Sequence, residues 1–167
     1  MPSLPLPKYV VFIDFDGVTH PLPGRTPRSL SDVMMRIDYF CPPNVSQVNR
    51  LMAALSAVGV ITSAWRLDFP WQDFQHYFDM RLAGQTPWLE KALWSTEIES
   101  FLSEQEWGAV PWLAIDDNPR LFSPGSPVLV TDASVGLTSA EVDLYLAKIS
   151  LQGTAQKTSI VYPCCDE

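Results

Sequence analysis

The sequence predicts an α/β fold in which a parallel sheet carries helices on its faces. Short apolar runs alternate with amphipathic stretches along the chain, which is the order typical of parallel sheets. Three of the four apolar runs lead directly into polar residues able to do chemistry, as strands do at the ligand-binding edge of such sheets. With 47% hydrophobic and 18% charged residues over 167 positions, the chain has the composition of a globular domain.

Four strands and three helices are expected from the apolar periodicity. The helix that begins at Asn44 carries apolar residues at helical spacing, and Gly59 is expected to end it. A second helix is expected over 95–104, capped by the serine or threonine at its start. Thr138 and Glu141 have the spacing of a capping box and predict the start of the last helix. The strands are expected at 9–14, 58–62, 110–115 and 127–131.

The length predicts a single domain over residues 1–167, with a core at about 8–150 and a C-terminal tail at 152–167. Residues 17–44 are rich in proline and are expected to form a loop or flap rather than a folded cap, whereas 67–82 are expected to be partly helical. The three cysteines are neither even in number nor spaced for a metal, so reduced thiols are expected.

The charge and the apolar pattern limit the classes of partner. A net charge of -8 works against long-range attraction to a polyanion, so nucleic acid is a weaker expectation than a small phosphorylated molecule. No stretch approaches the roughly 20 apolar residues of a membrane span, and the N-terminus lacks the pattern of a signal peptide. We therefore expect a cytoplasmic protein without a membrane partner, and the sequence leaves its oligomeric state open.

Two aspartates, Asp14 and Asp16, follow the first apolar strand and precede Gly17. Side chains two positions apart in an extended backbone point to the same side, so both carboxylates would emerge together where the strand ends. Two adjacent negative charges are costly unless a cation, hydrogen bonds or a pKa shift compensates, which indicates a metal ion or acid–base chemistry. The alternative is a solvated acidic turn without a function.

Two further strand ends carry groups of the same kind. Thr62 and Ser63 follow the second strand, and Asp116 and Asp117 follow the third. Gathered at one edge of a parallel sheet, these carboxylates and hydroxyls would form a site for Mg²⁺ and a phosphoryl group. Alternatively, the hydroxyl pair caps the helix that follows it.

Four segments, in order, resemble the haloacid dehalogenase-like (HAD) phosphohydrolase superfamily, and in particular its small, nearly capless members of the type found with RNA-repair proteins. Those members read DxDGVLHP, TSSWR, a DD pair and GLT, and this chain reads DFDGVTHP, TSAWR, IDDN and GLT. The resemblance implies a three-layer Rossmann-like sheet with helices on both faces, little or no cap, and hence an open site. The matching segments are 14–21, 62–66, 115–118 and 136–138.

The resemblance also implies a role for each matching residue. Asp14 would be the nucleophile, and Asp16 would be the general acid that protonates the leaving group and then activates water. Thr62 or Ser63 would hold the phosphoryl oxygens. The implied Mg²⁺ ligands are Asp14, Asp16, Asp116 and Asp117, with Asp16 acting through its backbone carbonyl.

The chain departs from the family at the cationic residue expected before the last acidic strand. Relatives carry an arginine three residues before a Glu-Ile pair, and this chain has Trp94 there. Lys91 and Arg66 are the alternatives for the role, and the other interpretation of Lys91 is an ordinary surface lysine. Without a cation at the phosphoryl site, turnover would be poor. The expected substrate-binding residues are Gly17, Arg66 and Asn118.

Together these features predict a Mg²⁺-dependent phosphatase, a phosphoric monoester hydrolase that acts through an aspartyl-phosphate. The expected substrate is a nucleotide or a nucleic-acid terminal phosphate, or otherwise another small or macromolecular phosphate ester. The alternative function is a catalytically weak HAD-fold protein that serves as a protein-binding or regulatory module, which the missing arginine favours.

Overall fold

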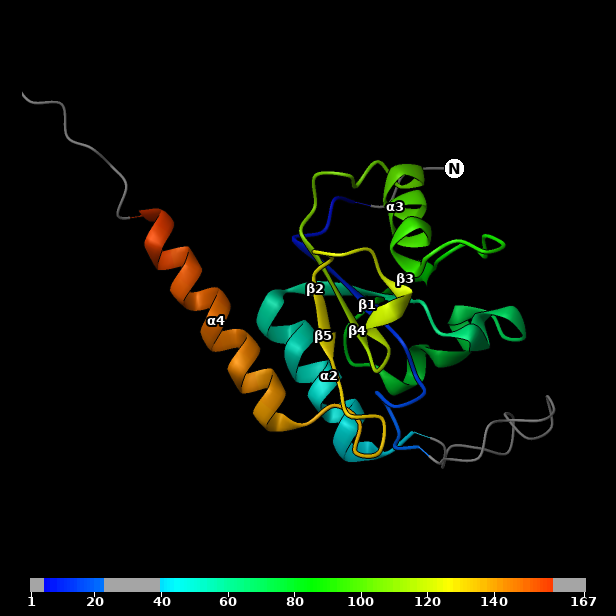
Figure 1. Cartoon of the computed structure of the whole chain (residues 1–167), viewed down its shortest axis with the longest axis horizontal. Helices are drawn as coiled ribbons and strands as arrows, with labels where there is room; N and C mark the ends of the chain where they lie inside the picture. The colour runs from blue at the N-terminus through cyan, green and yellow to red at the C-terminus, as the bar shows by residue number, and fades with distance from the viewer. Residues whose placement is uncertain (1–4, 23–39, 158–167) are drawn as a thin grey trace, which may run out of the picture.

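The computed structural model of the chain describes residues 5–22 and 40–157, with side chains through residue 151. Five parallel strands form one sheet in the order β3-β2-β1-β4-β5 (Figure 1). The predicted α/β class and parallel sheet are confirmed. The strands are β1 (Tyr9–Ile13), β2 (Ala57–Ile61), β3 (Leu82–Gln85), β4 (Trp112–Asp116) and β5 (Val128–Val130).

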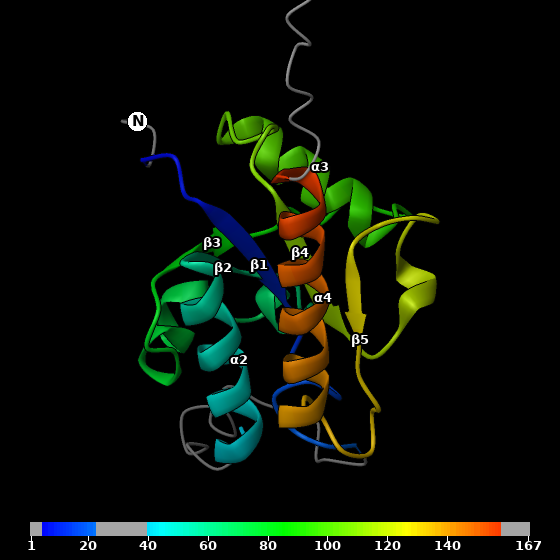
Figure 2. The same cartoon turned by 90° about the vertical axis from the view of Figure 1, so that its left-hand side faces the viewer.

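Helices cover both faces of the sheet (Figure 2). α2 and α4 pack side by side on one face, and α3 packs on the opposite face. Within the described residues, each helix is too short or too polar to cross a membrane. The helices are α2 (Pro42–Leu55), α3 (Trp94–Glu104) and α4 (Ser139–Lys157), with short 3-10 helices η1 (Ala64–Leu67), η2 (Trp71–Tyr77) and η3 (Pro119–Leu121).

The alternation of side chains along β1 divides the core into two halves. Val11 and Ile13 pack against the face covered by α2 and α4, and Val10 and Phe12 pack against the face covered by α3. All four side chains are fully buried. A strand buried on both faces explains why this segment is a continuous apolar run instead of an alternating one.

The structure corrects the expected end of α2. The helix ends at Leu55 rather than at Gly59, because Ser56 adopts a left-handed conformation (φ 50°) and closes it. Gly59 lies inside β2, where a Cβ atom would lie 2.7 Å from Cδ2 of Leu82 and 2.9 Å from Cε of Met52. This glycine therefore permits close packing between the sheet and α2 and does not terminate the helix.

β3 and the start of α3 also differ from expectation. Residues 82–85 form a fifth strand that the apolar pattern did not predict, because the segment is short and contains a glycine. The N-cap of α3 is Leu93, which offers no side-chain hydrogen bond to the helix. The Oγ atom of Ser95 instead lies 3.0 Å from Oγ of Ser123, so the predicted hydroxyl cap is wrong.

The predicted capping box at the start of α4 is confirmed. The backbone N–H of Thr138 donates to Oε2 of Glu141 at 2.8 Å, and the backbone N–H of Glu141 donates to Oγ1 of Thr138 at 3.3 Å. α4 continues to Lys157, into residues that the sequence had assigned to the tail. Most of the expected flap, at 23–39, and the rest of the expected tail, at 158–167, lie outside the described residues.

Gly59→Ala is expected to lower the free energy of unfolding by about 1–3 kcal/mol, because the added methyl group overpacks the contact between β2, β3 and α2. Urea unfolding measures the loss. Gly108→Ala is the matched control, since a Cβ atom at that glycine meets nothing within 4 Å. Equal losses in the two variants would contradict the packing role of Gly59.

Candidate active site

The register of the sheet brings the three predicted strand ends to one edge. β1 pairs in parallel with β2 on one side and with β4 on the other. Asp14 follows β1, Thr62 follows β2, and Asp116 is the last residue of β4. The carboxyl ends of neighbouring parallel strands form the usual ligand-binding edge of an open sheet. The sheet therefore places two carboxyl groups and one hydroxyl group, from three distant parts of the chain, at the same edge.

Asp14, Asp116 and Asp117 form an acidic cluster. One carboxylate oxygen from each residue lies within 4.8 Å of the other two. Asp14 and Asp116 are buried, and Asp117 is half-buried. Gly17, which has a left-handed conformation (φ 72°), allows this approach, because a Cβ atom there would lie 2.7 Å from Oδ2 of Asp117. Gly17, predicted to bind substrate, thus borders the acidic cluster.

Burial and mutual repulsion shift the acidity of the cluster. Burial raises the pKa of Asp14 well above its usual range, and the charges of Asp116 and Asp16 raise it further. Burial also raises the pKa of Asp116, to about 7, although the backbone N–H of Asn118 donates to its Oδ1 at 2.7 Å and opposes the shift. The pKa of Asp117 is raised in the same direction, again chiefly by burial. Without a cation, the cluster retains protons near neutral pH.

The acidic cluster fits a hard divalent cation. The Oδ2 atom of Asp116 is buried and has no hydrogen-bond partner within the described part of the chain. A cation held by the three carboxylates would satisfy that oxygen and favour their ionised forms, which burial and neighbouring charge disfavour. Mg²⁺ takes oxygen ligands and is commonly bound by one or two carboxylates together with a substrate phosphate and water. The cluster offers three carboxylate oxygens, which are ligands of the type that Mg²⁺ prefers.

The hydroxyls of Thr62 and Ser63 differ in their partners. The Ser63 hydroxyl donates to the Asp14 carboxylate, which lowers the pKa of Asp14 and so opposes the effect of burial. Ser63 also caps η1, because its Oγ accepts from the backbone N–H of Trp65 at 3.5 Å. The Oγ1 atom of Thr62 is buried and unpaired among the residues at 5–22 and 40–151. Thr62 therefore offers a hydroxyl that no protein group occupies there.

Asp16 lies in the loop after β1 and faces two aromatic nitrogens. The Nε1–H of Trp65 donates to Oδ2 of Asp16 at 3.0 Å, and Nε2 of His20 lies 3.0 Å from Oδ1. Both rings are buried, whereas the Asp16 side chain is 30% exposed. Neither ring is among the predicted site residues. Both rings nevertheless lie in segments that match the family motifs, His20 in DFDGVTHP and Trp65 in TSAWR.

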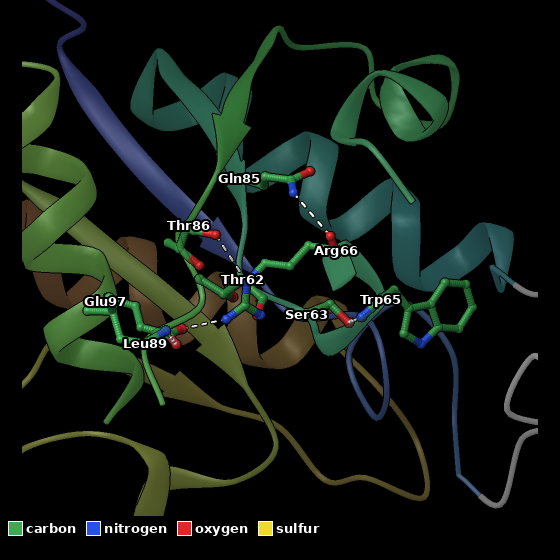
Figure 3. A network of polar contacts seen from close by, with 8 residues as sticks. All are labelled: Thr62, Ser63, Trp65, Arg66, Gln85, Thr86, Leu89 and Glu97. Atoms are coloured by element: carbon green, nitrogen blue, oxygen red, sulfur yellow. Dashed lines mark hydrogen bonds and ion pairs between the residues drawn. The ribbon is translucent and has the colours of Figure 1, made fainter. Parts of the chain in front are cut away.

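Arg66 occupies the centre of a buried polar network (Figure 3). Its guanidinium forms an ion pair with Glu97 of α3, and both side chains are 1% exposed. It also donates to the backbone carbonyls of Thr86, at 3.2 Å, and of Thr62. The ring of Trp94, where relatives carry an arginine, is centred 5.4 Å from the guanidinium carbon. In the structure the guanidinium of Arg66 contacts Glu97 and backbone carbonyls. Its role in substrate binding therefore stays a prediction.

The Lys91 and Asn118 side chains contact their neighbours in the sequence. Lys91 is 89% exposed, and its Nζ lies 3.6 Å from Oε1 of Glu90. Asn118 is exposed, and its Oδ1 accepts from the backbone N–H of Arg120 at 3.2 Å, which caps η3. Neither side chain has a described contact with the acidic cluster, so their predicted roles stay predictions. Glu97 was not assigned a role at the site, although it belongs to the Glu-Ile pair from which the position of the missing arginine was counted.

A cavity of about 530 Å³ lies beside the Arg66 network, at the end of β3. Trp71 and Trp88 line it together with Thr86. Trp88 is largely exposed, whereas Oγ1 of Thr86 is buried without a partner in the described residues. The cavity therefore combines aromatic surface with one unpaired hydroxyl.

A comparison with protein families agrees with this geometry. A family model described as the HAD domain in Swiss Army Knife RNA repair proteins matches residues 10–142. The chain belongs to this HAD family. The match extends from β1 to the start of α4, so it includes the whole acidic cluster and places the domain in the HAD hydrolase superfamily. No curated protein matches the chain.

Mg²⁺ is expected to stabilise this HAD domain more at about pH 8 than at about pH 5. Because the pKa values of Asp14 and Asp116 are raised, the metal-free folded chain binds more protons than the unfolded chain, and its stability falls as the pH rises from about 4 to about 7. Bound Mg²⁺ favours the ionised carboxylates and offsets that loss. Thermal unfolding with and without Mg²⁺ at the two pH values measures the effect.

The control for this prediction is a pair of charge-removing variants. Asp116→Asn should lose most of the stabilisation by Mg²⁺, because it removes one carboxylate of the cluster. Asp79→Asn, at an exposed aspartate, should retain it. A gain that is equal at both pH values, or that persists in Asp116→Asn, would contradict a metal site at the cluster.

Proposed function

We propose that the chain is a Mg²⁺-dependent phosphatase, a phosphoric monoester hydrolase that acts through an aspartyl-phosphate. The observation that carries the proposal is the acidic cluster of Asp14, Asp116 and Asp117 at the carboxyl edge of the sheet. Three carboxylates with raised pKa values are unfavourable for stability alone, which supports a functional site. Membership of the HAD family supports the same reaction class.

Asp14 is assigned as the nucleophile, with Ser63 donating to its ionised carboxylate. A carboxylate oxygen of Asp14 bonds to phosphorus while the bond to the leaving-group oxygen breaks. Asp16 donates its proton to that oxygen and later takes a proton from the water that hydrolyses the aspartyl-phosphate. The second step releases phosphate, and both aspartates return to their starting protonation states.

The acidic cluster would hold Mg²⁺, with the backbone carbonyl of Asp16 as the further ligand that the family resemblance implies. When bound, Mg²⁺ supplies positive charge that neutralises the phosphoryl oxygens and the carboxylates. Thr62, whose hydroxyl has no partner in the described chain, is assigned to donate to a phosphoryl oxygen. Arg66 is close enough to Asp14 for their charges to interact, and it contributes to the field of the site from its buried position.

The substrate we propose is a nucleotide or a nucleic-acid terminal phosphate. The aromatic side chains of Trp71 and Trp88 line a cavity of about 530 Å³, and such surfaces suit the planar face of a base. The family to which the chain belongs is described from RNA repair proteins. The net charge of -8 disfavours long-range attraction to a long polyanion, which favours a short substrate or a chain end.

A second candidate is a catalytically weak HAD-fold domain that serves as a protein-binding or regulatory module. The observation that favours it concerns the two predicted cations. Arg66 is paired with Glu97, and exposed Lys91 is paired with Glu90. If no cationic side chain contacts the phosphoryl group, less of the negative charge that develops in the transition state is neutralised, and the reaction is slower. Under this alternative the purified chain would bind a protein partner and have negligible turnover.

With Mg²⁺ present, the purified chain is expected to hydrolyse 4-nitrophenyl phosphate and phosphorylated nucleosides or oligonucleotide ends. Asp14→Asn should lower kcat/KM on the order of 1000-fold or more, because it removes the group that bonds to phosphorus. Steady-state release of nitrophenol and of phosphate measures both rates.

The matched control is Asp73→Asn, which makes the same chemical change at an exposed aspartate of η2 and should keep full activity. No turnover by the parent chain, or equal turnover by the parent and Asp14→Asn, would overturn the proposed function. Negligible turnover together with a stoichiometric protein partner would support the module instead.

A further inference from the structure

Two aromatic nitrogens lie beside the carboxyl group of Asp16, one at each oxygen. The Nε1–H of Trp65 donates to Oδ2 at 3.0 Å, and Nε2 of His20 lies 3.0 Å from Oδ1. The histidine contact is within ion-pair distance but off the line of a hydrogen bond. Contacts of catalytic groups are often poorly aligned without substrate and improve when it binds. Asp16 is thus restrained on two sides and remains partly exposed on a third.

Both rings are themselves fixed by the fold. The ring of Trp65 packs 5.5 Å from that of Phe15 and 5.7 Å from that of His20, measured between centroids. The loop that carries the histidine is closed by a hydrogen bond of 3.0 Å from the N–H of Gly17 to the carbonyl of His20. Figure 3 shows the Trp65 ring directed away from the guanidinium of Arg66. Neither ring can turn without disturbing the core.

The chemistry of the two rings suits the restraint of a proton donor. An indole N–H donates and cannot accept, so it orients Oδ2 of Asp16 in both protonation states of the aspartate. A general acid must point its proton at the leaving-group oxygen, and a small misplacement lowers the rate strongly. A carboxyl group in a loop has free rotation about its last bond unless neighbours restrict it. Trp65 and His20 provide that restriction here.

We propose that Trp65 and His20 are positioning residues that hold the Asp16 carboxyl group in the orientation from which it protonates the leaving group. The inference rests on the proposed function, because that function makes Asp16 the general acid. It adds a specific consequence: loss of either ring contact should matter most for substrates whose leaving group needs a proton. A purely structural role would slow all substrates by the same factor.

Trp65→Phe is the direct test, because it removes the N–H and keeps an aromatic ring in the core. With phenyl phosphate, whose leaving group requires a proton, kcat/KM should fall about 10- to 100-fold. With 2,4-dinitrophenyl phosphate, whose leaving group departs without one, the fall should stay below about 3-fold. Trp107→Phe makes the same change at a buried tryptophan in the core on the α3 face, and it should show no dependence on the leaving group.

The histidine is tested by a pair of variants. His20→Gln keeps an N–H donor at similar reach and should retain most of the activity on phenyl phosphate. His20→Leu removes the donor and should show the same leaving-group dependence as Trp65→Phe. His76→Leu, at an exposed histidine of η2, is the matched control. Equal losses on both substrates in Trp65→Phe and His20→Leu, or no loss in either variant, would overturn the inference.

A measurement without turnover keeps the test decisive if a ring variant fails to fold. The indole N–H signal of Trp65 in a ¹⁵N–¹H spectrum of the full chain should shift more than the other five indole signals in Asp16→Ala. An unchanged Trp65 signal would overturn the contact and the inference with it. If the Trp65 signal shifts but the parent chain has no turnover, the proposed function is overturned. If the parent chain turns over and the variants lose kcat/KM equally on both substrates, only the positioning role is overturned.

Discussion

Asp14 and Asp116 leave neighbouring parallel strands at the same edge of the sheet, so their carboxylates meet that of Asp117 where little water reaches. Burying like charges together is unfavourable, and the raised pKa values of all three groups express that cost. In its ionised form the acidic cluster needs a compensating positive charge. The proposed metal site and the proposed reaction both depend on these buried carboxylates, because they attract a cation and a bound cation stabilises their charged forms.

Hydrogen bonds from distant segments hold the loop after β1, at Gly17 and Val18, in place beside the acidic cluster. The hydroxyl of Thr131, after β5, donates to the carbonyl of Gly17 at 2.7 Å, and the N–H of Leu137 donates to the carbonyl of Val18 at 2.9 Å. Gly136 permits the second contact, because a Cβ atom there would lie 2.9 Å from the carbonyl oxygen of Val18. The GLT segment at 136–138 therefore supports the loop that carries the acidic residues. The resemblance identified the GLT segment as a matching motif but did not explain what it contacts.

Which strand ends meet could be predicted from the sequence, because Asp14 and Asp116 each follow an apolar run long enough for a buried strand. Groups whose partners come from elsewhere in the fold could not be predicted. Glu97 is an ordinary acidic residue by its position in the sequence, and only the packing of α3 makes it the buried partner of Arg66. β3 likewise becomes a strand through its pairing with β2, since its own four residues carry little strand preference. Local pattern therefore located the acidic site, and tertiary contacts determined its surroundings.

The most direct test of the acidic cluster is anomalous diffraction from crystals grown with Mn²⁺ and beryllium fluoride, a mimic of the phosphoryl group. Mn²⁺ is used because it shares the oxygen ligands of Mg²⁺ and gives an anomalous signal. We expect one peak bound by carboxylate oxygens of Asp14 and Asp116, with beryllium bonded to the other oxygen of Asp14. A map without a peak between these two residues, or with Mn²⁺ bound only elsewhere on the chain, would contradict the metal site and the reaction built on it.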